Sequence, residues 1–249
     1  MTKQFSLRLM LAVVTVLCVA LGVWGSPAER QRRAVKEIEA LGGRVRYAND
    51  LPGTWTDSRP KTLLRRWLPP DYFDEVRRVS LGDSPITDAG LDHLQGLTGL
   101  RFLSLRGREV TDTGLARLTG LTRLQTLGLG YTPLTDLGLA NLQRLTALQA
   151  LDLTDTGITD AGLIYLRGLT DLRIVVLDHT AIADAGVAHL QGLTNLHTLC
   201  LNDTEVGDAG LAHLRGLTNL RELEVWNTRV TDAGMARLSE VLPSCRIDR

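Results

Sequence analysis

Hydrophobic residues recur along this chain with a period of 24 residues over positions 76–243, which gives seven copies of one unit without an insertion. In each copy Leu or Val occupies the first, fourth and sixth positions, as at Leu148, Leu151 and Leu153 of the fourth copy. Alternation at the fourth and sixth positions predicts a short strand with one buried face.

A polar turn and a second apolar pattern follow each strand. Leu-type residues stand at the sixteenth, nineteenth and twenty-second positions, as at Leu163, Leu166 and Leu169. This spacing of three fits one apolar stripe on a short helix. Each copy is therefore predicted to fold as strand, turn and helix.

Polar residues that recur from copy to copy predict structural roles. Asp at the thirteenth position, such as Asp160, precedes each helical stripe, so we interpret these residues as helix caps and not as catalytic acids. Gly two residues later, such as Gly162, predicts close approach of neighbouring backbones. Thr at the ninth position, such as Thr156, predicts a hydroxyl hydrogen bond to the turn backbone.

Gly at the twenty-first position of most copies, such as Gly168, predicts a left-handed residue that ends the helix. Arg144 and Glu240 replace this Gly in two copies, and we expect looser helix ends there.

The pattern L-x-x-L-x-L at 24-residue intervals resembles the leucine-rich repeat family. The tail T-x-I-T-D-A-G-L is similar to the F-box-associated and cysteine-containing branch, which is also abundant in bacterial proteins. The resemblance covers about two-thirds of the chain. It implies an α/β solenoid with a curved parallel β-sheet on the concave side and short helices on the convex side. It also implies a binding scaffold, because the family consists mostly of such proteins.

The flanking segments predict an anchor and two caps. We expect residues 1–28 to form a signal-anchor or transmembrane segment and residues 29–75 an N-terminal α/β cap. Residues 76–243 would be the repeats, and residues 244–249 a C-terminal cap strand. The anchor rests on an uncharged stretch that, as a helix of roughly 30 Å, is long enough to span a bilayer.

The N-terminal cap carries local signals of its own. Ala34, Val35, Ile38 and Leu41 predict a helix, residues 45–47 a strand, and residues 63–68 a second short helix. Residues 48–60 are rich in Pro, Gly, Asn and Asp and predict a loop. Solenoids expose apolar ends, so a terminal cap is the expected role.

The side of the membrane stays open at this point. Residues 26–28, Ser-Pro-Ala, have the small side chains of a signal-peptidase site, so an exported form remains open. The basic cluster over residues 30–36 resists export, which favours an uncleaved single-pass anchor with cytoplasmic repeats. The resemblance to exported bacterial repeat proteins implies the opposite side.

Composition narrows the function further. The chain holds 28 Lys and Arg against 28 Asp and Glu, so a whole-chain nucleic-acid binder is disfavoured. Cys18, Cys200 and Cys245 form no CxxC motif and no even framework, so neither a zinc site nor a disulfide is indicated. No phosphate-binding loop, GxSxG or HExxH motif occurs.

The candidate binding site lies where the repeat varies. The third, fifth, seventh and eighth positions point away from the core and form rows across the sheet. These rows are basic at Arg77, Arg78 and Arg101, and acidic with aromatic residues over copies three to seven. Such a mixture is typical of protein-recognition surfaces, although a solvated face is the alternative. We expect a protein with a basic or mixed surface to bind Tyr131, Asp152, Asp155, Asp178, His179, Asn202, Asp203, Glu222, Glu224 and Trp226.

Two clusters on this face are candidates for chemistry. Cys200 lies one copy and three strand positions from His179, roughly 10 Å away, which is too far for thiol catalysis with His179 and Asp178. Asp155, His179 and Asp203 share one row and could form a weak divalent-metal site, although an exposed His between two carboxylates is the commoner outcome. We expect no cofactor and no small-molecule substrate.

The sequence therefore predicts a membrane-tethered, non-enzymatic leucine-rich repeat scaffold that binds another protein through its strand face. The alternative is a substrate-recognition adaptor of the ubiquitin-ligase type, which the F-box-associated repeat style implies. Against it, residues 29–76 show two short apolar stripes and not an F-box helical bundle.

Overall fold

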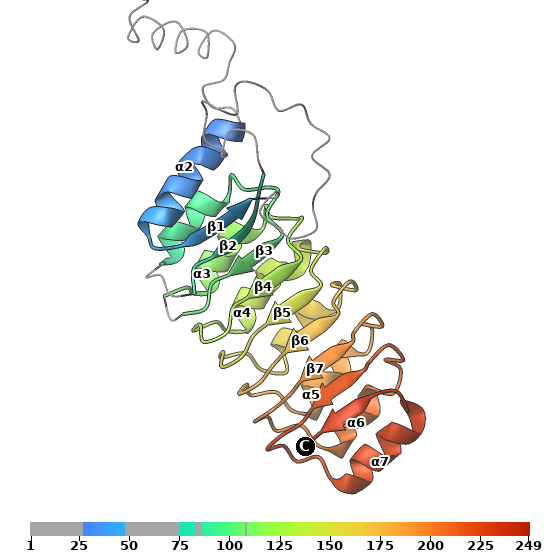
Figure 1. Ribbon diagram of the computed structural model, residues 1–249. Helices are drawn as coiled ribbons and strands as arrows, with labels where there is room; N and C mark the ends of the chain where they lie inside the picture. The colour runs from blue at the N-terminus through green and yellow to red at the C-terminus, as the bar shows by residue number, and fades with distance from the viewer. Residues whose placement is uncertain (1–26, 48–74, 83–85, 108) are drawn as a thin grey trace, which may run out of the picture.

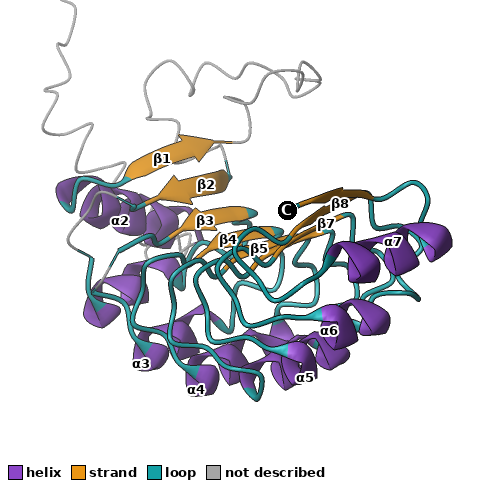
Figure 2. Cartoon of the chain, turned by 90° about the horizontal axis from the view of Figure 1, so that it is seen from below, coloured by secondary structure: helices purple, strands orange, loops and turns teal. Residues whose placement is uncertain are grey.

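The computed structural model describes residues 27–47, 75–82, 86–107 and 109–249, which stack copy upon copy into a curved solenoid (Figure 1). One nine-stranded sheet runs through this part of the chain in the order β1 to β9. Seen from below, the strands line the concave side and the helices the convex side (Figure 2). The predicted α/β repeat solenoid is thus confirmed.

The strands are short and regularly spaced. They are β1 (Arg44–Tyr47), β2 (Val76–Ser80), β3 (Phe102–Ser104), β4 (Thr126–Gly128), β5 (Ala150–Asp152), β6 (Ile174–Val176), β7 (Thr198–Cys200), β8 (Glu222–Glu224) and β9 (Arg246–Asp248). β1 pairs antiparallel with β2, and all later pairs are parallel. Equivalent residues stand side by side, as Leu127, Leu151 and Val175 do.

The helices that follow strands β2 to β7 are short, with three to seven residues each, whereas α2 and α7 at the two ends are longer. They are α2 (Pro27–Ala40), η4 (Asp88–Leu94), α3 (Asp112–Leu115), η5 (Ala116–Leu118), α4 (Asp136–Leu139), η6 (Ala140–Arg144), η7 (Gly162–Leu166), α5 (Asp184–Val187), η8 (Ala188–Leu190), α6 (Asp208–His213) and α7 (Asp232–Val241). The elements labelled η are 3₁₀ helices. A 3₁₀ helix has three residues per turn, which is the spacing of the Leu pattern.

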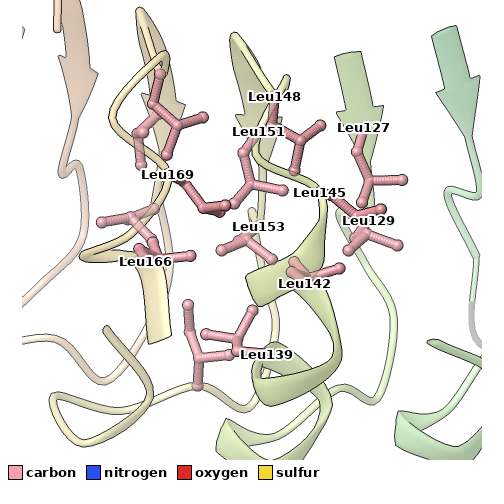
Figure 3. Close-up of a cluster of buried hydrophobic side chains, with 14 of the residues drawn as sticks. Leu127, Leu129, Leu139, Leu142, Leu145, Leu148, Leu151, Leu153, Leu166 and Leu169 are labelled. Carbon is pink, nitrogen blue, oxygen red and sulfur yellow. The ribbon is translucent and has the colours of Figure 1, made fainter. Parts of the chain in front are cut away.

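Leucine side chains from both layers meet in one continuous core (Figure 3). Leu151 and Leu153 point inward from the strand side and are 1% and 0% exposed. Leu142 and Leu145 come from the helix side and are also fully buried. Burying one such side chain stabilises the fold by about 1.5–3 kcal/mol, so the repeated Leu positions hold the layers together.

The helix ends differ from the prediction. η7 stops at Leu166, so Leu169 lies beyond the helix and is joined to it by one 3₁₀-type bond, Leu169 N–H to the Leu166 carbonyl at 2.9 Å. The predicted left-handed Gly is wrong, because among the described glycines only Gly42 and Gly107 have positive φ. Where Gly is replaced, the helix runs on: α7 passes through Glu240, and η6 ends at Arg144.

The Thr at the ninth position behaves as predicted. Its hydroxyl donates to the carbonyl three residues earlier, at 2.7 Å from Thr156 to Leu153 and at 2.5 Å from Thr180 to Leu177. Both Thr residues are buried, so each bond satisfies a carbonyl that water does not reach.

The recurring Asp residues correct a second prediction. Each helix begins at or beside its Asp, but the carboxylate bonds forward into the next copy. Asp112 accepts from the Thr135 N–H at 2.9 Å and from its hydroxyl at 2.5 Å. This pattern forms what we call the Asp ladder, made of Asp88, Asp112, Asp136, Asp160, Asp184 and Asp208.

The Gly at the fifteenth position serves this ladder. A Cβ added at Gly186 would collide with the Asp160 carboxylate and stand 3.1 Å from the Asp160 Cα. The predicted close approach is therefore real, but the group that comes close is mainly the Asp of the preceding copy.

Caps close the two ends of the described solenoid. α2 packs Ala34, Val35 and Ile38 into the core, and β1 extends the sheet as predicted. At the other end β9 adds the expected edge strand, with Ile247 in register with Leu223. The expected loop at residues 48–60, the helix at residues 63–68 and residues 1–26 of the expected anchor at 1–28 lie outside the described residues. No helix of the described part is long and apolar enough to cross a membrane.

Candidate functional site: the concave strand face

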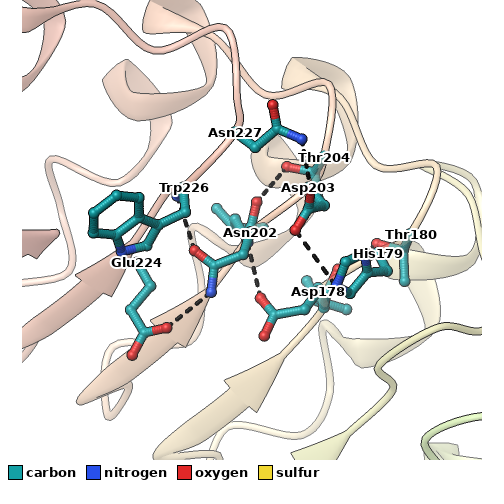
Figure 4. Close-up of polar contacts among 11 residues, drawn as sticks. Asp178, His179, Thr180, Asn202, Asp203, Thr204, Glu224, Trp226 and Asn227 are labelled. Atoms are coloured by element: carbon teal, nitrogen blue, oxygen red, sulfur yellow. Dashed lines mark hydrogen bonds and ion pairs between the residues drawn. The ribbon is translucent and has the colours of Figure 1, made fainter. Parts of the chain in front are cut away.

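A hydrogen-bonded network crosses the last three copies on the concave face (Figure 4). The Asn202 N–H donates to Asp178 Oδ1 at 2.8 Å, and the Asn202 amide donates to Glu224 Oε2 at 2.8 Å. The Trp226 N–H donates to Asn202 Oδ1 at 2.8 Å. Asn202 thus joins three other predicted site residues: it holds the Asp178 and Glu224 carboxylates and the Trp226 backbone.

Besides Tyr131, two large apolar side chains of the described residues are exposed on this side of the sheet. Trp226 is 57% exposed beside the network, and Ile174 at the start of β6 is 42% exposed. Ile174 was not among the residues predicted from the sequence. It could have been recognised because it is a large aliphatic residue at the third position, where the flanking strands carry Ala150 and Thr198.

The eighth position has a backbone role that the sequence did not reveal. Tyr131, Asp155, His179, Asp203 and Asn227 all have φ between 51° and 64°. Asn, Asp and His are enriched in this left-handed region, so much of this row reflects turn geometry. Tyr131 is the exception, because a bulky aromatic residue gains nothing from that conformation.

The row of Asp155, His179 and Asp203, weighed above as a weak metal site, does not gather three ligands at one point. His179 Nε2 lies 3.4 Å from Asp203 Oδ2, and the Asn227 amide donates to Asp203 Oδ1 at 2.6 Å. These contacts use the Asp203 carboxylate inside the row. No group of three metal-ligating side chains occurs among the residues that the structure describes.

The other predicted acids lie outside the network. Asp152 accepts from the N–H and hydroxyl of Thr154, at 3.0 and 2.6 Å, so it braces its own turn. Glu222 begins β8, in register with Thr198 and Arg246. Asp155 contributes its backbone N–H to the Asp178 carbonyl at 2.9 Å.

The electrostatics of the network follow from crowded carboxylates. Burial raises the pKa of Asp178, and the Glu224 charge adds to this against the hydrogen bonds from Asn202. Burial, together with Glu224, Asp178 and Glu222, raises the pKa of the Cys200 thiol to about 12. Cys200 is therefore protonated at neutral pH, and the thiolate that thiol catalysis needs does not form.

Tyr131 belongs to the basic end of the face. The Arg106 guanidinium carbon lies 4.4 Å from the centroid of the Tyr131 ring. The sequence predicted Tyr131 as an aromatic contact, together with Trp226, of the acidic part of the face. The structure separates it from the Asn202 network and joins it to a cation.

Comparisons with known proteins agree with this architecture. A family model described as "Leucine-rich repeat region" matches residues 75–246. No curated protein matches the chain. Among solved structures, internalin C2 of Listeria monocytogenes is similar at 25% identity and a TM-score of 0.53, over 66% of this chain and 77% of that one.

Two further structures share weaker likeness. Internalin InlF of Listeria monocytogenes has 24% identity and a TM-score of 0.40, over 64% of this chain and 56% of its own. A leucine-rich repeat protein of Leptospira interrogans has 19% identity and a TM-score of 0.46, over 64% of this chain and 45% of its own.

Proposed function

Because the chain belongs to the leucine-rich repeat family, we propose that it is a non-enzymatic scaffold that binds another protein through copies three to seven of its concave face. We also propose that its repeats are of the F-box-associated and cysteine-containing style, on the strength of the T-x-I-T-D-A-G-L tail.

The observation that carries the proposal is the ordered network beside exposed apolar side chains. Asn202 holds Asp178, Glu224 and the Trp226 backbone before any partner arrives. Side chains that are already ordered lose little entropy on binding. An exposed Trp in such a setting is the kind of residue that carries much of a binding energy.

The charge of this part of the face selects the partner. Burial raises the pKa of the Cys200 thiol, and the negative charges of Glu224, Asp178 and Glu222 raise it further, so this part of the face is acidic. A basic or mixed surface would relieve the repulsion among these charges, whereas an acidic one would add to it. The partner therefore carries Lys or Arg close to an apolar residue that meets Trp226 or Ile174.

Site-specific cross-linking tests the face. A photo-reactive amino acid placed at position 226 or 174 of the full-length chain should capture the partner, because both positions are exposed on the strand side. The same amino acid at position 189, on the helix side, is the matched control. Capture from position 189 alone would place the binding site on the convex face.

Affinity for the captured partner, once purified, tests the anchor residue. Trp226→Ala should weaken binding by about 2 kcal/mol or more. Charge reversal at Asp178 should act mainly through the association rate, and its effect should shrink as salt rises. Unchanged affinity in both variants would remove copies five to seven from the site.

The sequence also suggested a ubiquitin-ligase adaptor, as an alternative function, and a membrane anchor. Residues 27–47 form one helix and one strand that joins the sheet, and nothing in them favours a ubiquitin-ligase adaptor. The membrane anchor predicted at residues 1–28 remains part of the proposal. A mature chain that begins near residue 29 by mass spectrometry, and that washes off membranes, would contradict it.

A further inference from the structure

Two arginines at the N-terminal end of the concave face lie on aromatic rings. The Arg78 guanidinium carbon is 3.9 Å from the centroid of the Phe102 ring, and Arg106 is 4.4 Å from that of Tyr131. Arg78 and Phe102 are in register on β2 and β3. Both arginines are exposed, so solvent reaches them in the free protein.

Stacking leaves the binding edge of each guanidinium free. A guanidinium that covers a ring with its face still presents its in-plane N–H groups, which match a carboxylate in pairs. Arg77, Arg117 and Arg123 each pair with a carboxylate. Within the described ranges no carboxylate lies within ion-pair distance of Arg78 or Arg106.

Small residues separate the two stacks. Ser80, Ser104 and Gly128 occupy the fifth position of three neighbouring strands, in register. The fifth position lies between the third, where Arg78 stands, and the seventh, where Arg106 stands. No long side chain from these three residues rises between the stacks, so a bound segment can approach the strands there.

We propose that this basic surface, made of Arg78, Phe102, Arg106 and Tyr131, binds an acidic segment of the partner through its carboxylates. The inference rests on the proposed function, because the same partner places its basic part on copies five to seven. The acidic part then faces copies one to three. Opposite charges at the two ends fix the direction in which the partner lies across the repeats.

The acidic end of the face favours a polypeptide over a polyphosphate. A nucleic acid long enough to cross the sheet from β2 to β8 would meet Asp178 and Glu224 and be repelled. A polypeptide can change sign along its length, and its apolar side chains can contact Phe102 and Tyr131. The expected ligand is therefore a carboxylate-bearing protein segment.

Two peptide probes and two protein variants test the inference on the full-length chain. The acidic probe alternates Glu and Leu, and the basic probe alternates Lys and Leu. The variant R78Q/R106Q should weaken the acidic probe about tenfold or more and spare the basic one. The variant D178N/E224Q should do the reverse. Fluorescence anisotropy gives both affinities, and thermal unfolding confirms that each variant is folded.

Matched controls separate stacking from charge alone. The variant R144Q/R215Q removes the same charge from exposed residues outside the concave face and should leave the acidic probe unaffected. The variant R78K/R106K keeps the charge but loses the planar N–H edge, so it should not restore full affinity. Full affinity in the Lys variant would overturn the assigned geometry.

The remaining outcomes distinguish this inference from the proposed function. If R78Q/R106Q binds the acidic probe as well as the unmodified chain does, the basic surface is not a subsite. Loss of the basic probe in D178N/E224Q would still support the proposed function in that case. A single-stranded oligonucleotide that binds more tightly than the acidic probe, through the same two arginines, would overturn the carboxylate assignment.

Discussion

Asp112 begins helix α3, whereas Asp178 follows strand β6. The two carboxylates have opposite surroundings. Asp112 accepts an N–H and a hydroxyl from Thr135 of the next copy, at 2.9 and 2.5 Å. Asp178 accepts one N–H from Asn202, is partly buried, and has a raised pKa because burial and Glu224 oppose its charge. The Asp112 carboxylate is fully engaged in hydrogen bonds between two copies. The Asp178 carboxylate has unfavourable surroundings, which a cationic partner would improve.

The difference distinguishes carboxylates that recur in every copy from those that do not. The Asp ladder recurs because every copy offers the same N–H one repeat later, and a Gly leaves room for the carboxylate. The acids of the concave face do not recur: the fifth position carries Asp152, Val176, Cys200 and Glu224 in successive copies. Periodic acids therefore stabilise the fold, whereas aperiodic ones such as Asp178 and Glu224 are available to select a partner.

A core substitution should change the free energy of unfolding the most, and the other variants can be compared with it. Leu151→Ala removes a fully packed side chain and should lower the free energy of unfolding by about 2–5 kcal/mol. His189→Ala, at an exposed-side position of the helices, should change it by no more than about 0.5 kcal/mol. Urea unfolding measures both. Equal shifts would mean that the layers have been assigned to the wrong sides.

The Gly beside the ladder gives the next largest effect. Gly186→Ala places a Cβ against the Asp160 carboxylate, so it should cost about 1–3 kcal/mol. Gly168→Ala is the matched control, since its Cβ would meet nothing within 4 Å and its φ is not positive. We expect that control to be neutral or slightly stabilising. A similar loss from both would show that the ladder does not need its Gly.

The contributions of Asp208 and Asp178 to stability should depend on acid pH with opposite signs. The Thr231 N–H and hydroxyl lower the pKa of Asp208, so its contribution to stability is present above the ordinary Asp value and is lost as pH falls through the folded-state value. Asp178 has a raised pKa, so it costs stability as pH rises from the ordinary value through the folded-state value.

Unfolding of Asp208→Asn and Asp178→Asn over a range of acid pH measures this. The stability lost in Asp208→Asn should shrink as pH falls. The gain expected from Asp178→Asn at neutral pH should vanish in acid. If both substitutions changed stability in the same direction at neutral pH, the contrast between Asp208 and Asp178 would be contradicted.

The sequence was sufficient for the core and for the Thr bond in the turn, which both lie within one copy, but not for the conformation of the helix ends. The Leu spacing predicted strands and core, and Thr156 bonds within its own turn as its position predicted. Bonds between copies were beyond its reach. Asp112 and Thr135 are far apart along the chain and meet only when copies stack, so the Asp was interpreted as a cap of its own helix.

The candidate site could be predicted only in outline. The variable rows lie on the concave strand side, and Asn202 joins three other predicted residues. Nothing in the sequence showed that the eighth position is left-handed, which accounts for Asp155 and Asp203 by turn geometry. Nor could it show that Arg106 covers Tyr131, because that contact depends on the side-chain arrangement between two copies.

The most direct test removes equal charge from each set of carboxylates. One triple variant changes Asp112, Asp136 and Asp160 to Asn, and the other changes Asp152, Asp178 and Asp203 to Asn. For each, urea unfolding is measured together with affinity for the partner captured from position 226. The ladder variant should lose stability and, while folded, keep its affinity; the face variant should lose affinity and keep most of its stability. A face variant that binds as tightly as the unmodified chain would contradict the account.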